Sequence, residues 1–121
     1  MKLYAETHEW VEIANGIATI GISKHAADEL GDLTYIELPE QGRDFKAGES
    51  FGTVESVKAA SEIFAPVAGK VSEVNQAVVD SPEVVNQDAE GEGWLVKLSN
   101  VDESAIAGLM GEADYLKSLE K

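Results

Sequence analysis

Apolar and polar residues alternate over short stretches of the chain, and glycine, proline or asparagine separates these stretches. Two of them, residues 10–13 and 17–22, flank Asn15-Gly16. Both residues of this pair tolerate positive φ, so they suit a two-residue type I′ turn between antiparallel strands. The pattern therefore predicts a β-hairpin.

Short helices are predicted where a capping residue precedes helix-forming residues. Ser23 can act as the N-cap of a helix over residues 24–30, and Gly31 can end that helix. Ser81 followed by Pro82 indicates the start of a second helical turn, with the serine as its cap and the proline in its first position.

The C-terminal segment, residues 102–121, is helical in character, and Gly111 is expected to divide it into two short helices. Its apolar residues are candidates for burial: Ile106, Leu109, Met110, Leu116 and Leu119. The segment is therefore predicted to form a helical tail.

Five more stretches have the composition or alternation of strands: residues 33–38, 51–57, 61–67, 71–75 and 94–98. Many short strands with a helical tail indicate a mostly β fold, either a small sandwich or a barrel. The length of 121 residues fits one domain with a real core, so residues 1–121 are expected to form a single domain.

The charge balance argues against several classes of partner. The chain has 23 acidic and 9 basic residues, which gives a formal charge of −14. Such a field repels phosphate backbones and anionic lipids, so neither nucleic-acid binding nor membrane binding is expected. No stretch approaches the roughly 20 apolar residues of a membrane helix, and the N-terminus is unlike a secretory signal or a transit peptide. We therefore expect a cytoplasmic protein, with a processed organellar form as the alternative.

Residue patterns that are typical of enzymes are missing from the sequence. The chain has no cysteine and only two histidines, His8 and His25, whose spacing does not indicate a transition-metal site. Neither a phosphate-binding glycine loop nor the Gly-x-Ser-x-Gly of serine hydrolases is present. No catalytic residue and no metal ligand is predicted, so we expect a protein that is not an enzyme.

Lys58 is the most informative residue for function. It lies near the reversal between residues 51–57 and 61–67, so it is predicted to sit at a hairpin tip among small residues. A lysine there is either ordinary surface charge or a handle for covalent modification. A Schiff-base lysine needs burial or a neighbouring cation, whereas Lys58 has Glu55 and Glu62 nearby in sequence. The residues around Lys58 leave the first two interpretations open.

The sequence around Lys58 resembles the lipoylation site of one family, the H proteins of the glycine cleavage system. The segment is residues 55–61, Glu-Ser-Val-Lys-Ala-Ala-Ser, and the valine before the lysine separates it from related carriers, which have aspartate or methionine there. Other segments resemble the family in the same order along the chain: residues 8–11, 21–23, 25–26, 30–32, 37–39, 65–69, 74–75, 81–83, 85–86 and 91–94. The resemblance thus covers most of the chain.

This resemblance implies a lipoyl/biotinyl-carrier fold of the hybrid-motif type, with two antiparallel sheets, short helices and a C-terminal helical tail. It also implies that lipoate is joined to Lys58 by an amide, which lipoate-attaching enzymes would form. The lipoyl arm would be the reactive group, while the protein positions and shields it. We expect this carrier to be a monomer.

The resemblance further implies three enzyme partners. A glycine decarboxylase that uses pyridoxal phosphate would load the aminomethyl fragment of glycine, and an aminomethyltransferase that uses tetrahydrofolate would take the one-carbon unit. A dihydrolipoyl dehydrogenase that uses FAD would reoxidise the dithiol. A tethered arm suits this sequence of steps because it delivers its load at high effective concentration.

In the family the loaded arm folds back into a groove on its own protein, and three residues here match that groove. They are Glu9, with Thr7 beside it, and Glu62 near the arm. We expect Glu9 to pair with the ammonium of the load and burial to exclude water. The alternative for Glu9 is a solvent-exposed carboxylate at a strand edge.

Three other functions stay open on the sequence. An H-like protein would relay lipoyl groups to other lipoyl domains. The chain would otherwise be an unmodified interaction module in which Lys58 is ordinary surface, or a lysine-dependent enzyme. The mass of the protein from its native cells separates the unmodified module from the lipoylated carriers.

Overall fold

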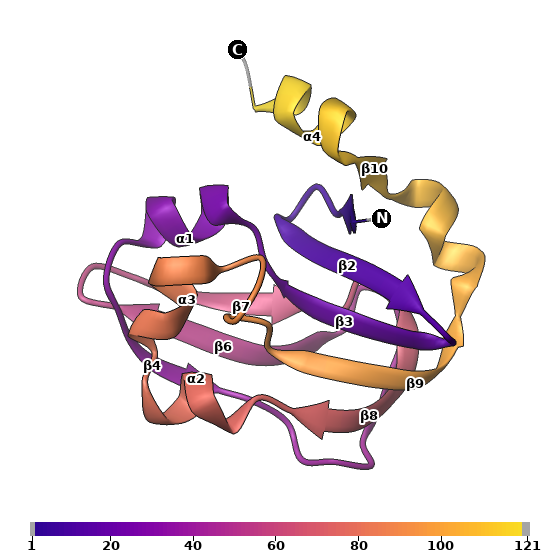
Figure 1. The fold of residues 1–121 in the computed structure, drawn as a ribbon, viewed down its shortest axis with the longest axis horizontal. Helices are drawn as coiled ribbons and strands as arrows, with labels where there is room; N and C mark the ends of the chain where they lie inside the picture. Colours follow the sequence, from indigo (N-terminus) through magenta and orange to yellow (C-terminus); the bar gives the residue numbers. More distant parts are fainter. Residues whose placement is uncertain (1, 120–121) are drawn as a thin grey trace.

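Residues 2–119, which the computed structural model describes, form mainly short strands (Figure 1). The strands are β1 (Lys2–Tyr4), β2 (Glu9–Ala14), β3 (Ile17–Ile22), β4 (Leu33–Glu37), β5 (Asp44–Phe45), β6 (Ser50–Ser56), β7 (Ala60–Phe64), β8 (Ala68–Val74), β9 (Val96–Asp102) and β10 (Met110–Gly111). The helices are α1 (Lys24–Leu30), α2 (Gln76–Asp80), α3 (Glu83–Asp88) and α4 (Glu112–Ser118), with a 3-10 helix, η1 (Glu103–Gly108), between β9 and β10.

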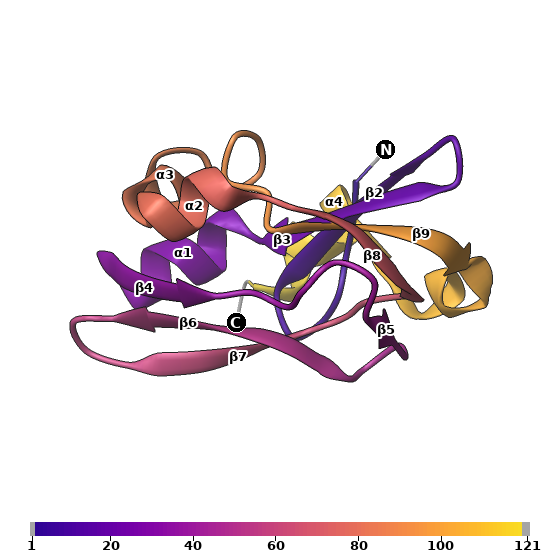
Figure 2. The same ribbon diagram turned by 90° about the horizontal axis from the view of Figure 1, so that it is seen from below.

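The strands form two antiparallel sheets that face each other. The larger sheet has the order β10-β1-β2-β3-β9-β8-β5, and the smaller sheet has the order β4-β6-β7. Figure 2 shows the sheets as two layers, with α1, α2 and α3 together at one end. The predicted mostly β sandwich of two antiparallel sheets with short helices and a C-terminal helix is confirmed. None of the helices in this described part of the chain has the length and apolar character that crossing a membrane requires.

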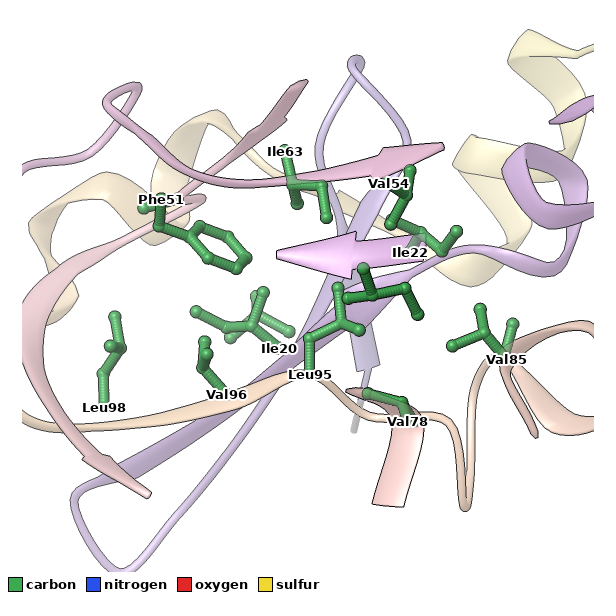
Figure 3. Close-up of a cluster of buried hydrophobic side chains, with 14 of the residues drawn as sticks. Ile20, Ile22, Phe51, Val54, Ile63, Val78, Val85, Leu95, Val96 and Leu98 are labelled. Atoms are coloured by element: carbon green, nitrogen blue, oxygen red, sulfur yellow. The ribbon is translucent and has the colours of Figure 1, made fainter. Parts of the chain in front are cut away.

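The hydrophobic core fills the space between the two layers. Ile20 and Val96 of the larger sheet, and Val54 and Ile63 of the smaller sheet, are buried and point into this space (Figure 3). Burying each such side chain contributes roughly 1.5–3 kcal/mol relative to leaving it in water. The hairpin of β6 and β7 is therefore anchored along one face, while its turn lies at the end of the molecule beside α1 (Figure 2).

Two local predictions are confirmed by the backbone. Asn15 and Gly16 have φ of 54° and 76°, as a type I′ turn requires, and they join β2 to β3. The Ser23 hydroxyl oxygen accepts a hydrogen bond from the Ala26 N–H at 3.1 Å, and α1 ends at Gly31, whose φ is 78°. The sequence therefore places both ends of α1 correctly.

The prediction that Ser81 caps a helix is wrong. α3 follows Pro82 and has no hydrogen bond from a capping side chain. The Ser81 N–H instead donates to the Ala77 carbonyl at 2.9 Å and ends α2, a helix that the sequence pattern does not predict. The signal for α2 is Asn75, whose side chain accepts from the Ala77 N–H at 3.2 Å, but its position at the end of a strand hides this role. The last long strand also begins later than predicted, at Val96.

The C-terminal segment forms two short helical elements, η1 and α4, and Gly111 lies between them in β10, so the predicted division is confirmed, although the first element is a 3-10 helix. In α4 the buried residue is Tyr115, whereas Leu116 is 55% exposed, so the predicted burial of Leu116 is wrong. Successive residues point about 100° apart on an α-helix, and Tyr115 takes the inward direction because its ring stacks on Tyr4. The other four candidates are partly buried: Ile106, Leu109, Met110 and Leu119. Residues 120 and 121 of the predicted segment lie outside the described residues.

Candidate functional site

Lys58 lies in the tight turn that joins β6 to β7. The Ser56 N–H donates to the Ala59 carbonyl at 2.7 Å, and the Ser56 hydroxyl oxygen accepts from the Ala59 N–H at 3.1 Å. These bonds close the turn without using the Lys58 side chain. Lys58 is exposed, and its neighbour Val57 is 78% exposed. The predicted place of Lys58 at a hairpin tip is confirmed, and its amine is accessible to another protein.

The end of α1 lies beside the Lys58 side chain. A Cβ atom built on Gly31 would be 3.5 Å from Lys58 Cε. Gly31 has φ of 78° and ψ of −157°, a conformation that favours glycine. The Asn86 side chain of α3 holds this segment, because it donates to the Gly31 carbonyl at 2.8 Å and accepts from the Leu33 N–H at 2.9 Å. The surface next to Lys58 is thus fixed by two helices.

Glu9 lies at the start of β2 and is buried, with 2% of its surface exposed. One carboxylate oxygen accepts a hydrogen bond from the Thr7 hydroxyl, and the other accepts from the Phe64 N–H at 3.1 Å. Burial raises the pKa of Glu9, and the bonds from Thr7 and Phe64 act against that shift. The alternative of a solvent-exposed Glu9 is therefore wrong.

A pocket of about 380 Å³ opens beside Glu9. Thr7 and Phe64 line it together with apolar neighbours such as Pro66 and Leu109. Both Thr7 and Glu9 line the pocket, and Thr7 is exposed whereas Glu9 is buried. The pocket therefore combines a buried carboxylate with a largely apolar wall.

The structure brings Thr7 and Glu9 together and places Lys58 and Glu62 along the neighbouring hairpin. β7 rises about 3.3 Å per residue, so Phe64, its last residue, lies on the order of 13 Å from its first. Glu62 is exposed between these two points. β7 is an edge strand of the smaller sheet, and it runs from the Lys58 turn to Phe64, whose N–H binds Glu9.

The sequence does not predict the hydrogen bonds of His8, the residue next to Glu9. His8 has φ of 78°, and its Nδ1 lies 2.7 Å from the hydroxyl of Tyr115, which is 107 residues away. The same hydroxyl lies 2.7 Å from Ser23 Oγ. The rings of His8 and His25 also come together, with centroids 5.0 Å apart.

No group of three His, Cys, Asp or Glu side chains within residues 2–119 is arranged to hold a metal ion.

Comparisons with known proteins agree over almost the whole chain. The family model described as "Glycine cleavage H-protein" matches residues 2–121. The chain is 54% identical over 113 residues to the glycine cleavage system H protein of Herpetosiphon aurantiacus, which covers 93% of this chain and 86% of that protein. It is 49% identical over 115 residues to the H protein of Thermotoga maritima, with 95% and 93% covered.

A solved structure gives the same result for the fold. The crystal structure of a glycine cleavage system H protein from Mycobacterium marinum is similar with a TM-score of 0.89 and 35% sequence identity, over 99% of this chain and 97% of that one. These matches concern the whole fold rather than one short motif. The chain therefore belongs to the glycine cleavage H-protein family, and it is a lipoyl carrier of the glycine cleavage system rather than an enzyme.

Proposed function

We propose that Lys58 is the lysine that bears the lipoyl group, through an amide at Nζ. The observation that carries this proposal is the position of Lys58, which is exposed on a closed turn and lies beside Gly31. An attaching enzyme can reach this amine, and the residue fits an amide-linked arm because no core contact has to be broken. The amide is uncharged, so the modified residue gains length and loses its cation.

Lipoate supplies the disulfide and dithiol chemistry, while the protein supplies attachment, position and shielding. The protein works with glycine decarboxylase, aminomethyltransferase and dihydrolipoyl dehydrogenase. The three enzymes need the same arm in turn. An arm on the Lys58 turn can enter each partner from the end of the molecule and remains at high effective concentration between the steps.

We also propose that residues 1–121 act as one monomeric domain in the cytoplasm. The relatives from Herpetosiphon and Thermotoga are bacterial proteins, and bacterial glycine cleavage systems are generally cytoplasmic. The formal charge of −14 opposes self-association of the carrier.

We propose that the loaded end of the arm returns to the pocket beside Glu9. The load carries an ammonium group, with which the buried Glu9 carboxylate can form a charge-assisted hydrogen bond. Thr7 holds one oxygen of Glu9, and the apolar wall of the pocket excludes the water that would hydrolyse the load. Glu62, exposed on β7, attracts the ammonium along the way. Arrival of the cation favours the charged form of Glu9 against the burial that raises its pKa.

Intact mass and peptide mapping of the protein from its native cells test the Lys58 proposal. The expected result is one lipoyl amide on Lys58, with Lys70 unmodified in the same digest. Lys70 is also exposed, so it serves as an internal control for non-specific acylation. A bare Lys58 in cells that lipoylate their other carriers would contradict the proposal.

The rate at which the loaded protein releases formaldehyde and ammonia tests the Glu9 proposal. Glu9→Gln keeps the size of the side chain and an oxygen that can accept from the Phe64 N–H, but it removes the charge. A hydrogen bond to a charged group contributes about 1.5–3 kcal/mol, so release should be about ten- to a hundredfold faster. Glu73→Ala, which removes an exposed carboxylate from β8, should leave the rate unchanged. Equal rates in Glu9→Gln and the unmutated protein would remove Glu9 from this role.

A further inference from the structure

Tyr115 of the C-terminal helix reaches the turn that precedes β2. α4 lies over the N-terminal segment of the chain (Figure 1), and the Tyr115 ring stacks on Tyr4 with centroids 4.4 Å apart and planes within 6°. Its hydroxyl lies 2.7 Å from His8 Nδ1 and 2.7 Å from Ser23 Oγ. The residue is 2% exposed. Tyr115 does not line the pocket beside Glu9, so any effect on the load has to be indirect.

The side chains around the Tyr115 hydroxyl can form one directional chain of hydrogen bonds. The Ala26 N–H donates to Ser23 Oγ at 3.1 Å, which leaves the Ser23 hydroxyl proton for Tyr115. The Tyr115 hydroxyl can then donate to His8 Nδ1, with the imidazole proton on Nε2. Hydrogen bonds in such a chain polarise and strengthen one another. The N-cap of α1 and the C-terminal helix thereby hold the same imidazole.

The backbone of His8 is left-handed, with φ of 78°. This conformation is uncommon for residues other than glycine and persists where the surroundings fix it. The His8 N–H donates to the Ala5 carbonyl at 2.9 Å, and its carbonyl accepts from the Ser23 N–H at 2.8 Å. The turn at His8 brings the Thr7 hydroxyl back to the Glu9 carboxylate. Whatever holds His8 therefore also sets the direction of the Thr7–Glu9 pair.

We infer that Tyr115 is a positioning residue for the carrier: through His8, it fixes the turn that aims Thr7 and Glu9 at the loaded arm. The inference rests on the proposed role of Glu9. Tyr115 contacts the His8 imidazole, so we expect its effect on the load to pass through the Thr7–Glu9 pair. The C-terminal helix thereby affects how long the load survives.

Tyr115→Phe tests this inference because it removes the hydroxyl and keeps the stacked ring. The lost neutral hydrogen bonds predict release of formaldehyde and ammonia about two- to tenfold faster. Tyr35→Phe is the control, since it removes a hydroxyl from a residue that is 51% exposed, and it should leave release unchanged. In a Glu9→Gln background, Tyr115→Phe should add no further acceleration. Equal acceleration by Tyr115→Phe in the unmutated protein and in Glu9→Gln would overturn the inference. It would also be overturned if Glu9→Gln releases the load faster while Tyr115→Phe alone leaves the release rate unchanged.

A second measurement on the unloaded protein separates failure of this inference from failure of the Glu9 proposal. The carboxyl titration of Glu9 and the amide chemical shift of Phe64, both followed by NMR, report on the bond between them. If Glu9→Gln leaves release unchanged, the Glu9 proposal fails and the NMR titration decides on Tyr115. A displaced Glu9 titration in Tyr115→Phe supports positioning. An unmoved titration and an unmoved Phe64 amide overturn it, even where the melting temperature falls.

Discussion

The two ends of the β6–β7 hairpin are built in opposite ways. At the tip, Lys58 is exposed, and the turn is closed by bonds between Ser56 and Ala59, three residues apart. At the base, the Phe64 N–H binds Glu9, which is 55 residues away in the sequence and 2% exposed. One end depends on local contacts and the other on contacts between distant segments.

This difference matches the two tasks that we propose for the hairpin. A tip held by local bonds can be modified and handled by several enzymes without disturbing the core. A base enclosed by distant segments can hold a charge away from water, where an electrostatic interaction is stronger. Substitutions at the tip should therefore change lipoylation and spare stability, whereas substitutions at the base should change the lifetime of the load and the stability of the fold.

The largest expected effect is complete loss of lipoylation in Lys58→Arg. The guanidinium keeps the positive charge but does not replace the lysine amine as the acceptor of the acyl group. Because Lys58 is exposed, the free energy of unfolding should change by about 0.5 kcal/mol or less. Intact mass after incubation with a lipoate-attaching enzyme, together with a thermal melt, measures both quantities. Lys70→Arg should still accept one lipoyl group, and a lipoylated Lys58→Arg protein would contradict the assignment.

Gly31→Ala tests whether a change at the end of α1, next to the tip, affects both stability and lipoylation of Lys58. Alanine at φ of 78° and ψ of −157° is strained, and such a residue costs on the order of 1–3 kcal/mol. The new Cβ would also lie 3.5 Å from Lys58 Cε and restrict the side chain. We expect a loss of stability of that size in urea unfolding and slower lipoylation. Gly108→Ala, whose Cβ would meet nothing within 4 Å, is the matched control, and equal stability of the two variants would refute the effect.

The sequence predicts the local parts of this arrangement and misses the distant ones. Asn15-Gly16 and Ser23 specify a turn and a cap because the relevant chemistry lies within a few neighbouring residues. The place of Lys58 at a reversal follows in the same way from the flanking strands. The bond from Phe64 to Glu9 depends on which strand edge faces which turn. The alternation of apolar and polar residues within one segment does not predict this contact between distant segments.

The C-terminal helix shows the same limit for burial. Apolar character favours Leu116 for the buried face, but the structure buries Tyr115 instead. A tyrosine is stable there because Tyr4 offers a ring to stack on and His8 and Ser23 offer partners for the hydroxyl. These partners come from the other end of the chain, so the pattern of the segment itself does not reveal them.

A smaller effect is expected when the turn at the tip loses its side-chain bonds. Ser56→Ala removes the oxygen that accepts from the Ala59 N–H at 3.1 Å and from the Lys58 N–H at 3.3 Å. Because these groups are exposed and can bind water, the loss of stability should be about 0.5 kcal/mol, at the low end for a hydrogen bond. Lipoylation should slow slightly as the turn becomes less ordered. Ser56→Thr keeps a hydroxyl and should behave like the unmutated protein in both assays. A loss of stability above about 1.5 kcal/mol in Ser56→Ala would show that the turn depends on more than its own hydrogen bonds.

The smallest effect is a pH dependence that belongs to the base of the hairpin. Burial, and then the neighbouring His25, lower the pKa of His8 below its ordinary value of about 6.5, while Glu29 acts weakly in the opposite direction. The unfolded chain therefore binds more protons than the folded one between the lowered pKa and about 6.5, so stability rises with pH in that window. The contribution of neutral His8 is fully present above about pH 6.5 and is lost as the pH falls through the window. Melting temperatures at pH 7.5 and 5.5 should show a larger acid loss in the unmutated protein than in His8→Asn, which tolerates positive φ and does not titrate. Glu9 and His25 are present in both proteins. Equal falls in melting temperature would therefore mean that burial does not lower the pKa of His8.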